Sequence, residues 1–144
     1  MRWVWLIGVM CLALTAVACG GDDGSDNEAS RAAEGIYASF LDQDFGRAWD
    51  TLHPSHQAIV ARDTFINCQT GNTVPWTSVE VIREHDEIWE APEVGQITSR
   101  AVESRLIGDQ DITQGTLHML EVDGEWRWFL DEDAVRTFKQ GQCP

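Results

Sequence analysis

Hydrophobic residues between positions 30 and 52 recur every three or four residues, which is the spacing of one face of an α-helix. Asp42-Gln43-Asp44 interrupts the pattern, which therefore predicts two successive helices. Ser30 and Asp44 are placed to cap their first turns, and Pro54 ends the second helix because proline has no N–H to donate. The hydrophobic positions of the two helices are Ala33, Ile36, Tyr37, Phe40, Leu41, Phe45, Ala48, Trp49 and Leu52.

Two further helices are predicted, one in the middle of the chain and one near its end. Residues 55–69 carry hydrophobic side chains at helical spacing, and Gly71 is placed to stop that helix. Near the C-terminus, Asp131-Glu132-Asp133 begins a short helix, since acidic residues suit the positive end of the helix dipole and Lys139 suits the negative end. The acidic trio is therefore expected to cap a helix.

After Pro75 the pattern changes to runs of β-branched and aromatic residues, which are typical of strands. The runs cover residues 78–89, 96–107 and 111–130, and the last of them contains the tight-turn sequence Asp123-Gly124. Helices followed by an antiparallel meander make an α+β domain. We expect three N-terminal helices, the sheet and a short C-terminal helix.

The first 18 residues have the layout of an export signal. A short basic start is followed by an uncharged stretch, residues 3–18, that is short for a membrane-spanning helix. The end of this stretch, residues 14–20, resembles the lipobox of bacterial lipoproteins. The resemblance implies that Cys19 carries a diacylglyceryl thioether and becomes the first mature residue. The alternatives are a signal cleaved before Cys19 without lipidation and an uncleaved anchor.

The chain therefore divides into three segments. Residues 1–18 are the predicted lipoprotein signal peptide, residues 19–29 the lipidated cysteine with a disordered acidic tether, and residues 30–144 the folded domain. The tether is predicted because residues 20–28 contain no hydrophobic side chain to bury. Acyl chains such as palmitate, two or more together, attach a protein stably, so we expect lipid anchoring to the cell membrane on its extracytoplasmic face.

The charge of the chain limits its partners. Twenty-four acidic residues and ten basic ones give a formal net charge of −14. This charge disfavours nucleic acid and repels anionic lipid headgroups, so we expect contact with the membrane through the lipid anchor alone. It favours cations, basic proteins or plain solubility.

Two cysteines remain for the folded domain. Cys11 is removed with the signal and Cys19 is used for lipidation, which leaves Cys68 and Cys143. In an oxidising compartment two such cysteines are expected to form a disulfide. A redox site is not expected, because the sequence has no Cys-x-x-Cys motif to lower a thiol pKa. Two separate free thiols are the alternative.

The order of the predicted elements resembles the NTF2-like superfamily, an α+β cone (cystatin-like) that includes the ketosteroid isomerases and SnoaL-type polyketide cyclases. Residues 48–54 of the second helix and residues 62–65 of the third are similar to segments of small bacterial lipoproteins of this kind, and residues 125–130 would be the closing strand. The likeness covers residues 30–140. It implies three helices packed on a curved sheet with a pocket between them, and a generic α+β domain is the alternative.

The enzymes of this superfamily place a tyrosine on the first helix and carboxylates in the pocket. Tyr37 stands in a comparable place, but residues 70–75 supply no carboxylate where the isomerases have their base. The four histidines form no metal-binding motif, and no nucleophile elbow surrounds a serine. We therefore predict no catalytic residue, no cofactor and no metal site.

Aromatic residues are the remaining lead to function. A cone lined by aromatic rings suits an apolar ligand, and we predict a pocket formed by Tyr37, Trp49, Trp89, His118 and Trp126. The leading hypothesis is a non-catalytic envelope lipoprotein that binds an apolar small molecule or an envelope component there. The alternatives are a protein-interaction module that uses its sheet face, with an envelope protein or as a homodimer, and an enzyme of the isomerase or cyclase kind.

Overall fold

The computed structural model describes residues 27–144, which form a four-stranded antiparallel sheet and five helices. The predicted signal peptide, Cys19 and most of the predicted tether lie outside the described residues. The prediction of an α+β domain is confirmed. In chain order the elements are α1 (Glu28–Leu41), α2 (Phe45–Asp50), α3 (Pro54–Gln57), α4 (Arg62–Thr70), β1 (Ser78–Ala91), β2 (Gly95–Ile107), β3 (Ile112–Val122), β4 (Glu125–Trp128) and α5 (Glu132–Lys139).

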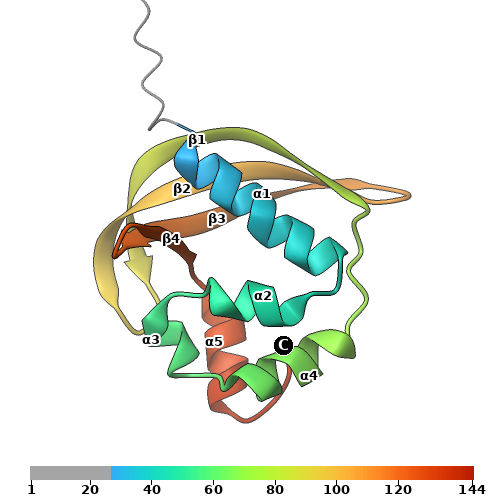
Figure 1. Ribbon diagram of the computed structural model, residues 1–144, viewed down its shortest axis with the longest axis vertical. Coiled ribbons are helices and arrows are strands. Elements are labelled where there is room, and N and C mark those ends of the chain that lie inside the picture. The colour runs from blue at the N-terminus through green and yellow to red at the C-terminus, as the bar shows by residue number, and fades with distance from the viewer. Residues whose placement is uncertain (1–26) are drawn as a thin grey trace, which may run out of the picture.

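The sheet curves over the helices, with α1 beneath it and the other helices gathered below (Figure 1). Its strand order is β1-β2-β3-β4, so β1 and β4 are the two edges. Residues 51–53 cover β4, because His53 N–H donates to the Trp128 carbonyl at 2.8 Å and Trp128 N–H donates to the Thr51 carbonyl at 3.2 Å. Within the described residues, β1 has no strand beside its outer edge.

The hydrophobic core lies between one face of the sheet, here called the inner face, and the helices. Residues opposite one another on paired strands share a face. Val102 pairs with Leu117 and Met119 with Trp128, and this set marks the inner face. The buried members of the core are Ala29, Ala33, Ile36, Tyr37, Phe45, Ala48, Leu52, Val60, Phe65, Cys68, Val102, Met119, Trp128, Leu130, Val135 and Phe138.

Helix α1 begins earlier than predicted, and its cap is a different residue. It starts at Glu28, and Ala29, which was predicted to lie in the tether, is fully buried. Ser30 lies inside the first turn, so its prediction as the cap is wrong. The carboxylate of Glu84 on β1 accepts from Ser30 N–H at 2.6 Å and from Ser30 Oγ at 2.5 Å. An acceptor from the sheet thus satisfies a backbone donor that has no partner within the helix.

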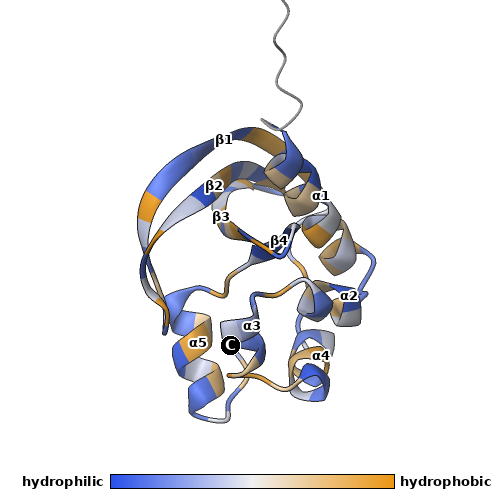
Figure 2. Cartoon of the chain, turned by 60° about the vertical axis from the view of Figure 1, so that its left-hand side comes forward, coloured by the Kyte–Doolittle hydropathy of each residue, from blue (hydrophilic) through white to orange (hydrophobic). Residues whose placement is uncertain are grey.

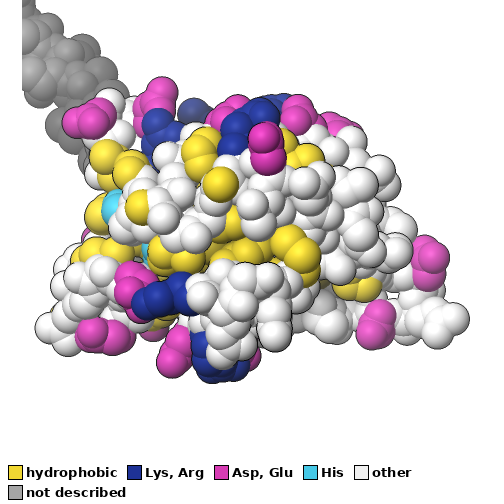
Figure 3. All heavy atoms as spheres, turned by 90° about the horizontal axis from the view of Figure 1, so that it is seen from below, with side chains coloured by type: hydrophobic (Ala, Val, Ile, Leu, Met, Phe, Trp, Pro, Cys, Tyr) yellow, Lys and Arg dark blue, Asp and Glu magenta, His cyan; other side chains and the backbone are white. Residues whose placement is uncertain are grey.

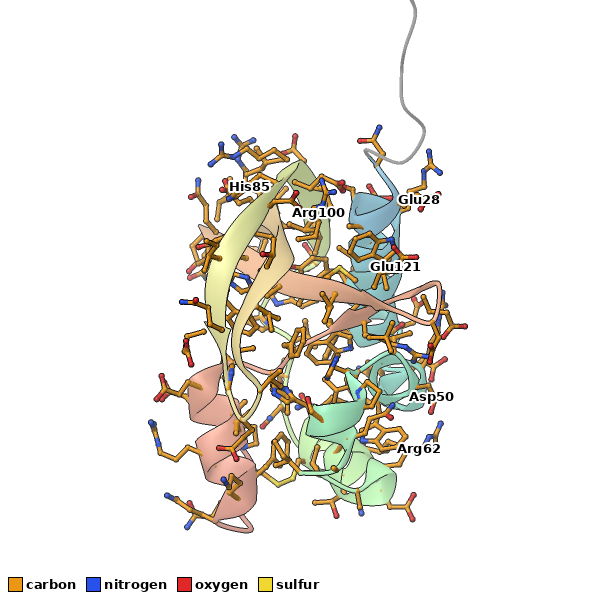
Figure 4. All side chains as sticks on the ribbon, turned by 90° about the vertical axis from the view of Figure 1, so that its left-hand side faces the viewer. Glu28, Asp50, Arg62, His85, Arg100 and Glu121 are labelled. Carbon is orange, nitrogen blue, oxygen red and sulfur yellow. A yellow bond between two sulfur atoms is a disulfide. The ribbon has the colours of Figure 1, made fainter. Side chains whose placement is uncertain are left out.

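The predicted third helix, residues 55–69, is two helices, so the expected count of three N-terminal helices is corrected to four. The chain breaks between α3 and α4 at Val60, where the indole N–H of Trp49 donates to the Val60 carbonyl at 2.9 Å. The Val60 carbonyl thus accepts from the indole in place of the backbone N–H that a continuous helix would supply. Arg62 then joins Asp50 of α2 at 2.9 Å, which ties α4 to α2 (Figure 4).

Pro54 does not end the second helix as predicted, because α2 stops at Asp50 and Pro54 is the first residue of α3. Three other local predictions agree with the structure. Asp44 caps α2 by accepting from Arg47 N–H at 3.1 Å, and Asp131 caps α5 by accepting from Ala134 N–H at 2.7 Å. Asp123 and Gly124 form the β3–β4 turn with φ angles of 54° and 80°. Positive φ at both positions suits the twist of a two-residue hairpin, and glycine adopts it without steric cost.

Cys68 of α4 and Cys143 beyond α5 form the disulfide that the sequence predicts, with a Cα–Cα distance of 5.2 Å. The rings of Phe65 and Phe138 pack beside it, with centroids 6.2 Å apart. The bond and this contact hold the C-terminal helix to the helical half of the domain. Among residues 27–144, no helix combines the length and the hydrophobicity that crossing a membrane requires.

Candidate functional site

The structure brings together two of the five predicted pocket residues, Trp89 and His118. The imidazole of His118 on β3 stacks on the indole of Trp89 on β1, with ring centroids 4.1 Å apart and planes 1° from parallel. His118 lies opposite Ala101, one position away from the Val102–Leu117 pair of the inner face. Because side chains alternate along a strand, the stack lies on the outer face of the sheet.

The other three predicted residues lie at the core. Tyr37 is 9% exposed and meets Trp76 edge-on, with centroids 5.8 Å apart. Trp49 is held by its bond to the Val60 carbonyl, and Trp126 packs against the core from β4. These three rings therefore fill the space beneath the sheet in which the sequence predicted a ligand.

Burial raises the pKa of Tyr37, and the Ser104 hydroxyl beside the phenol acts in the opposite direction. The contact with Ser104 does not reach hydrogen-bond geometry, since Ser104 Oγ has no partner among the described residues. Within the described chain, no carboxylate contributes to this shift in the Tyr37 pKa.

Phe129 extends the Trp89–His118 stack into a larger cluster. Its ring meets Trp89 edge-on at 5.4 Å, stacks with His53 at 4.4 Å and meets His56 edge-on at 5.2 Å, all measured between ring centroids. We call these five side chains the aromatic–histidine cluster. Sequence reasoning did not identify Phe129, His53 or His56 as part of a site. The alternation along residues 125–130 places Phe129 on the face opposite Trp128, which is the one signal available for it.

His56 fixes the geometry of the cluster. It is 0% exposed, its Nδ1 accepts from Leu130 N–H at 3.0 Å, and its Nε2 lies 2.8 Å from the Pro92 carbonyl. The N–H of Leu130 requires Nδ1 to be an acceptor, so the proton is assigned to Nε2, which donates to Pro92. Burial lowers the pKa of His56, so the ring is neutral at neutral pH. One neutral imidazole thereby joins the β1–β2 turn to the start of α5.

The His118 ring is also held in place. Its Nδ1 lies 3.0 Å from Ser99 Oγ, and Ser99 is 0% exposed. Burial lowers the pKa of His118 as well. A neutral imidazole stacked flat on an indole presents an aromatic surface rather than a positive charge.

The end of the β1–β2 hairpin lies beside α5 (Figure 2). Residues of these two segments line two adjoining cavities, and the inner one reaches Trp89, His118 and Phe129 of the cluster. The inner cavity has a volume of about 260 Å³ and the outer one about 580 Å³. We call the two together the α5 groove. Trp89, Glu90, Pro92, Thr116, His118, Phe129, Leu130, Asp131 and Glu132 line the inner cavity. Ala91, Glu93, Gly95, Val135, Arg136, Lys139 and Gln140 join Glu90, Pro92 and Glu132 around the outer one.

The α5 groove is an open depression beside α5, which lies at the lower end of the molecule in Figure 1. Seen from below, hydrophobic side chains form a band across this side, with histidine atoms at one end and acidic side chains around its border (Figure 3). Lys139 of α5 and Glu93 of the hairpin turn form an ion pair of 2.9 Å across the outer cavity. The groove can therefore hold a small molecule against aromatic rings at one end, while charged side chains line the other end.

Beyond Ala101, the outer faces of β1 and β2 carry charged side chains. Arg83 pairs with Glu103 at 2.6 Å and Arg105 with Glu80 at 3.0 Å, while His85 lies beside Glu103 (Figure 4). The Arg83 guanidinium lowers the pKa of Glu103. This part of the sheet carries paired charges and offers no broad apolar surface to a partner.

Within residues 27–144, no group of three or more His, Cys, Asp or Glu side chains is arranged to hold a metal ion. Comparison of the chain with protein-family models, with curated proteins and with solved structures gave no match in any of the three. The case for a function is thus the geometry of the α5 groove.

Proposed function

We propose that this protein is an exported, lipid-anchored binding protein that holds a small, largely apolar molecule in the α5 groove and performs no catalysis. The observation that carries the proposal is the joining of Trp89, His118 and Phe129 along one wall of a cavity. Small-molecule sites are concave and combine apolar walls with polar groups that fix the ligand. The inner cavity offers the side chains of Trp89, Phe129 and Leu130 as apolar wall, and polar and acidic side chains line the rest of it.

Two features support export and anchoring. The pattern of residues 1–19 is that of a lipoprotein signal, and the Cys68–Cys143 disulfide is typical of an oxidising compartment. The curved antiparallel meander that follows the N-terminal helices supports an NTF2-like cone as the fold family. The proposed ligand site differs from the pocket which that family suggests, because aromatic side chains fill the space under α1.

The experiment is native mass spectrometry of the mature protein, purified from its own envelope in mild detergent. We expect a bound mass that leaves on denaturation, and we expect Trp89→Ala to lose it. Ile88→Ala is the matched control, because Ile88 is the neighbouring residue on β1, is 71% exposed and points to the opposite face. An empty protein, or a ligand retained equally by Trp89→Ala, would count against the proposal.

One observation favours a second function, which is partner binding through β1. This edge strand is 14 residues long, pairs with β2 on one side and has no strand on its other side among the described residues. Its Ile82 is 42% exposed and its Ile88 71% exposed. Unpaired edges are sites where a second chain can add a strand, although charged side chains such as those on β1 oppose it. A dimer mass in the same spectra that Ile88→Lys abolishes would support this function.

A further inference from the structure

We propose that the ligand of the α5 groove is an organic cation: a small aromatic or aliphatic body that carries a quaternary or otherwise permanent positive charge. This inference rests on the proposed function and adds the chemical class of the ligand. It is argued from the aromatic wall, the charges at the mouth of the inner cavity and the state of His118.

The wall of the inner cavity has the chemistry that cations prefer. The faces of aromatic rings carry negative electrostatic potential, and tryptophan attracts cations more strongly than the other aromatic side chains. Trp89 and Phe129 both line the cavity, with ring centroids 5.4 Å apart and planes at 69°. At this distance the two rings touch edge to face, and His118 covers one face of Trp89. The rings therefore form a corner, and a compact charge can pack against it from the open side.

The charged residues around this cavity are all acidic. Glu90, Asp131 and Glu132 line it, and its described lining contains no lysine or arginine. Asp131 uses one oxygen to cap α5 at 2.7 Å, which offsets the positive end of that helix. Within the described residues, neither Glu90 nor Glu132 forms an ion pair or a hydrogen bond through its side chain. Two carboxylates therefore remain to balance the charge of a ligand.

The positive groups of the groove lie in the outer cavity and are already paired. Lys139 is 2.9 Å from Glu93, and Arg136 contacts Asp133. The positive charge of the ligand is thus expected in the inner cavity, against the aromatic rings, with the rest of the molecule directed toward Val135.

His118 does not oppose a cation at neutral pH. Its ring lines the inner cavity, and burial keeps it neutral by lowering its pKa. Of the charged groups that act on it, Glu87 favours protonation and His85 disfavours it, both more weakly than burial does.

The test is a calorimetric titration of the full mature protein with three probes of matched shape at mildly alkaline pH. N-methylquinolinium is the cation, 2-methylquinoline the neutral counterpart and quinoline-2-carboxylate the anion. We expect the cation to bind at least about tenfold more tightly than the neutral probe, a difference of about 1.4 kcal/mol. Raising the salt concentration should weaken the cation alone.

Variants test whether the preference for the cation arises from the carboxylates of the inner cavity. Glu90→Gln with Glu132→Gln should cut cation affinity by about tenfold and leave the affinity of the neutral probe unchanged. Glu121→Gln is the control, because Glu121 is exposed on β3 and does not line the α5 groove (Figure 4). Equal affinity for cation and neutral probe, or a preference for the anion, would overturn the cation inference and leave the proposed binding function standing. Failure of all three probes to bind would overturn both.

Discussion

The imidazole of His56 has both ring nitrogens engaged by backbone groups of segments that are distant in the sequence. Leu130 N–H and the Pro92 carbonyl have His56 as their partner; the bond to Leu130 is buried and the bond to Pro92 is partly buried. An unpaired buried donor or acceptor costs about 1–3 kcal/mol, so the two hydrogen bonds of the ring add to the stability that its packing provides.

Replacing His56 by phenylalanine keeps a ring beside Phe129 and removes both hydrogen bonds. We expect His56→Phe to lower the free energy of unfolding by about 2–4 kcal/mol, because a buried N–H and a partly buried carbonyl lose their partner. His85→Phe on the charged sheet face is the control and should change it by less than about 1 kcal/mol. Urea denaturation followed by tryptophan fluorescence measures both, and equal losses would show that His56 acts by packing alone.

Burial lowers the pKa of His53, His56 and His118 below the ordinary value of 6.5, so the folded protein takes up protons at these rings less readily than the unfolded chain. This contribution to stability is fully present above 6.5 and is lost as the pH falls below it. We expect Tm to fall between about pH 7.5 and pH 5.5. His118→Phe, which keeps a ring on Trp89 but cannot titrate, should make the fall shallower. A Tm that rises over this interval would contradict the assignment of neutral rings.

At the level of elements, the first turn of α1 depends on a residue of the sheet. The side chain of Glu84 is buried, and its carboxylate accepts hydrogen bonds from the N–H and the hydroxyl of Ser30. The same carboxylate lies 3.5 Å from the guanidinium of Arg100 on β2. A carboxylate at the start of a helix satisfies a free N–H and interacts favourably with the helix dipole. The start of α1 and the middle of β1 are therefore expected to open together.

Glu84→Ala should lower the free energy of unfolding by about 1–2 kcal/mol, in the range for the loss of a helix cap. Ser30→Ala removes the hydroxyl but leaves the backbone N–H bonded to Glu84, so its effect should be smaller. Hydrogen exchange of the first-turn amides of α1 is the more local measurement. Unchanged protection in Glu84→Ala would show that the cap is dispensable.

The elements differ in how far the sequence predicts them. The caps at Asp44 and Asp131 and the Asp123-Gly124 turn are local, because each side chain acts within a few residues of its own position. The break at Val60 and the cap from Glu84 are not local, since the partners are brought in by the fold. The periodicity of hydrophobic residues along the sequence contains no information about an acceptor that another element supplies.

The candidate site shows the same limit. Trp89 and His118 were predicted to line one pocket within the cone, and their rings are stacked on each other on the outer face of the sheet. Assigning Tyr37, Trp49 and Trp126 to the same site required the strand register and the curvature of the sheet, which single-sequence patterns do not contain. Phe129 reaches Trp89 because the hairpin end bends toward α5, which is a property of the whole sheet.

At the scale of the whole molecule, the disulfide joins residues separated by 75 positions in the chain. Closing a loop of this length restricts the unfolded chain and stabilises the fold by about 4 kcal/mol in the chain-entropy model. We expect Cys68→Ser with Cys143→Ser to lose about 2–4 kcal/mol, and the wild type to show the same loss in a strong reductant. Stability that is insensitive to both would mean that the bond adds nothing beyond the packing of Phe65 on Phe138.

The start of α1 lies at the top of the molecule in Figure 1, and α5, which lines the groove, lies toward the bottom. A chain attached to a bilayer ahead of α1 would therefore carry its ligand site on the end that faces the surrounding fluid. Solutes would enter from the bulk phase without first partitioning into the leaflet. The protein would then bind solutes from the fluid outside the cell surface, as a tethered receptor does. A partner that receives the ligand would have to approach from that side.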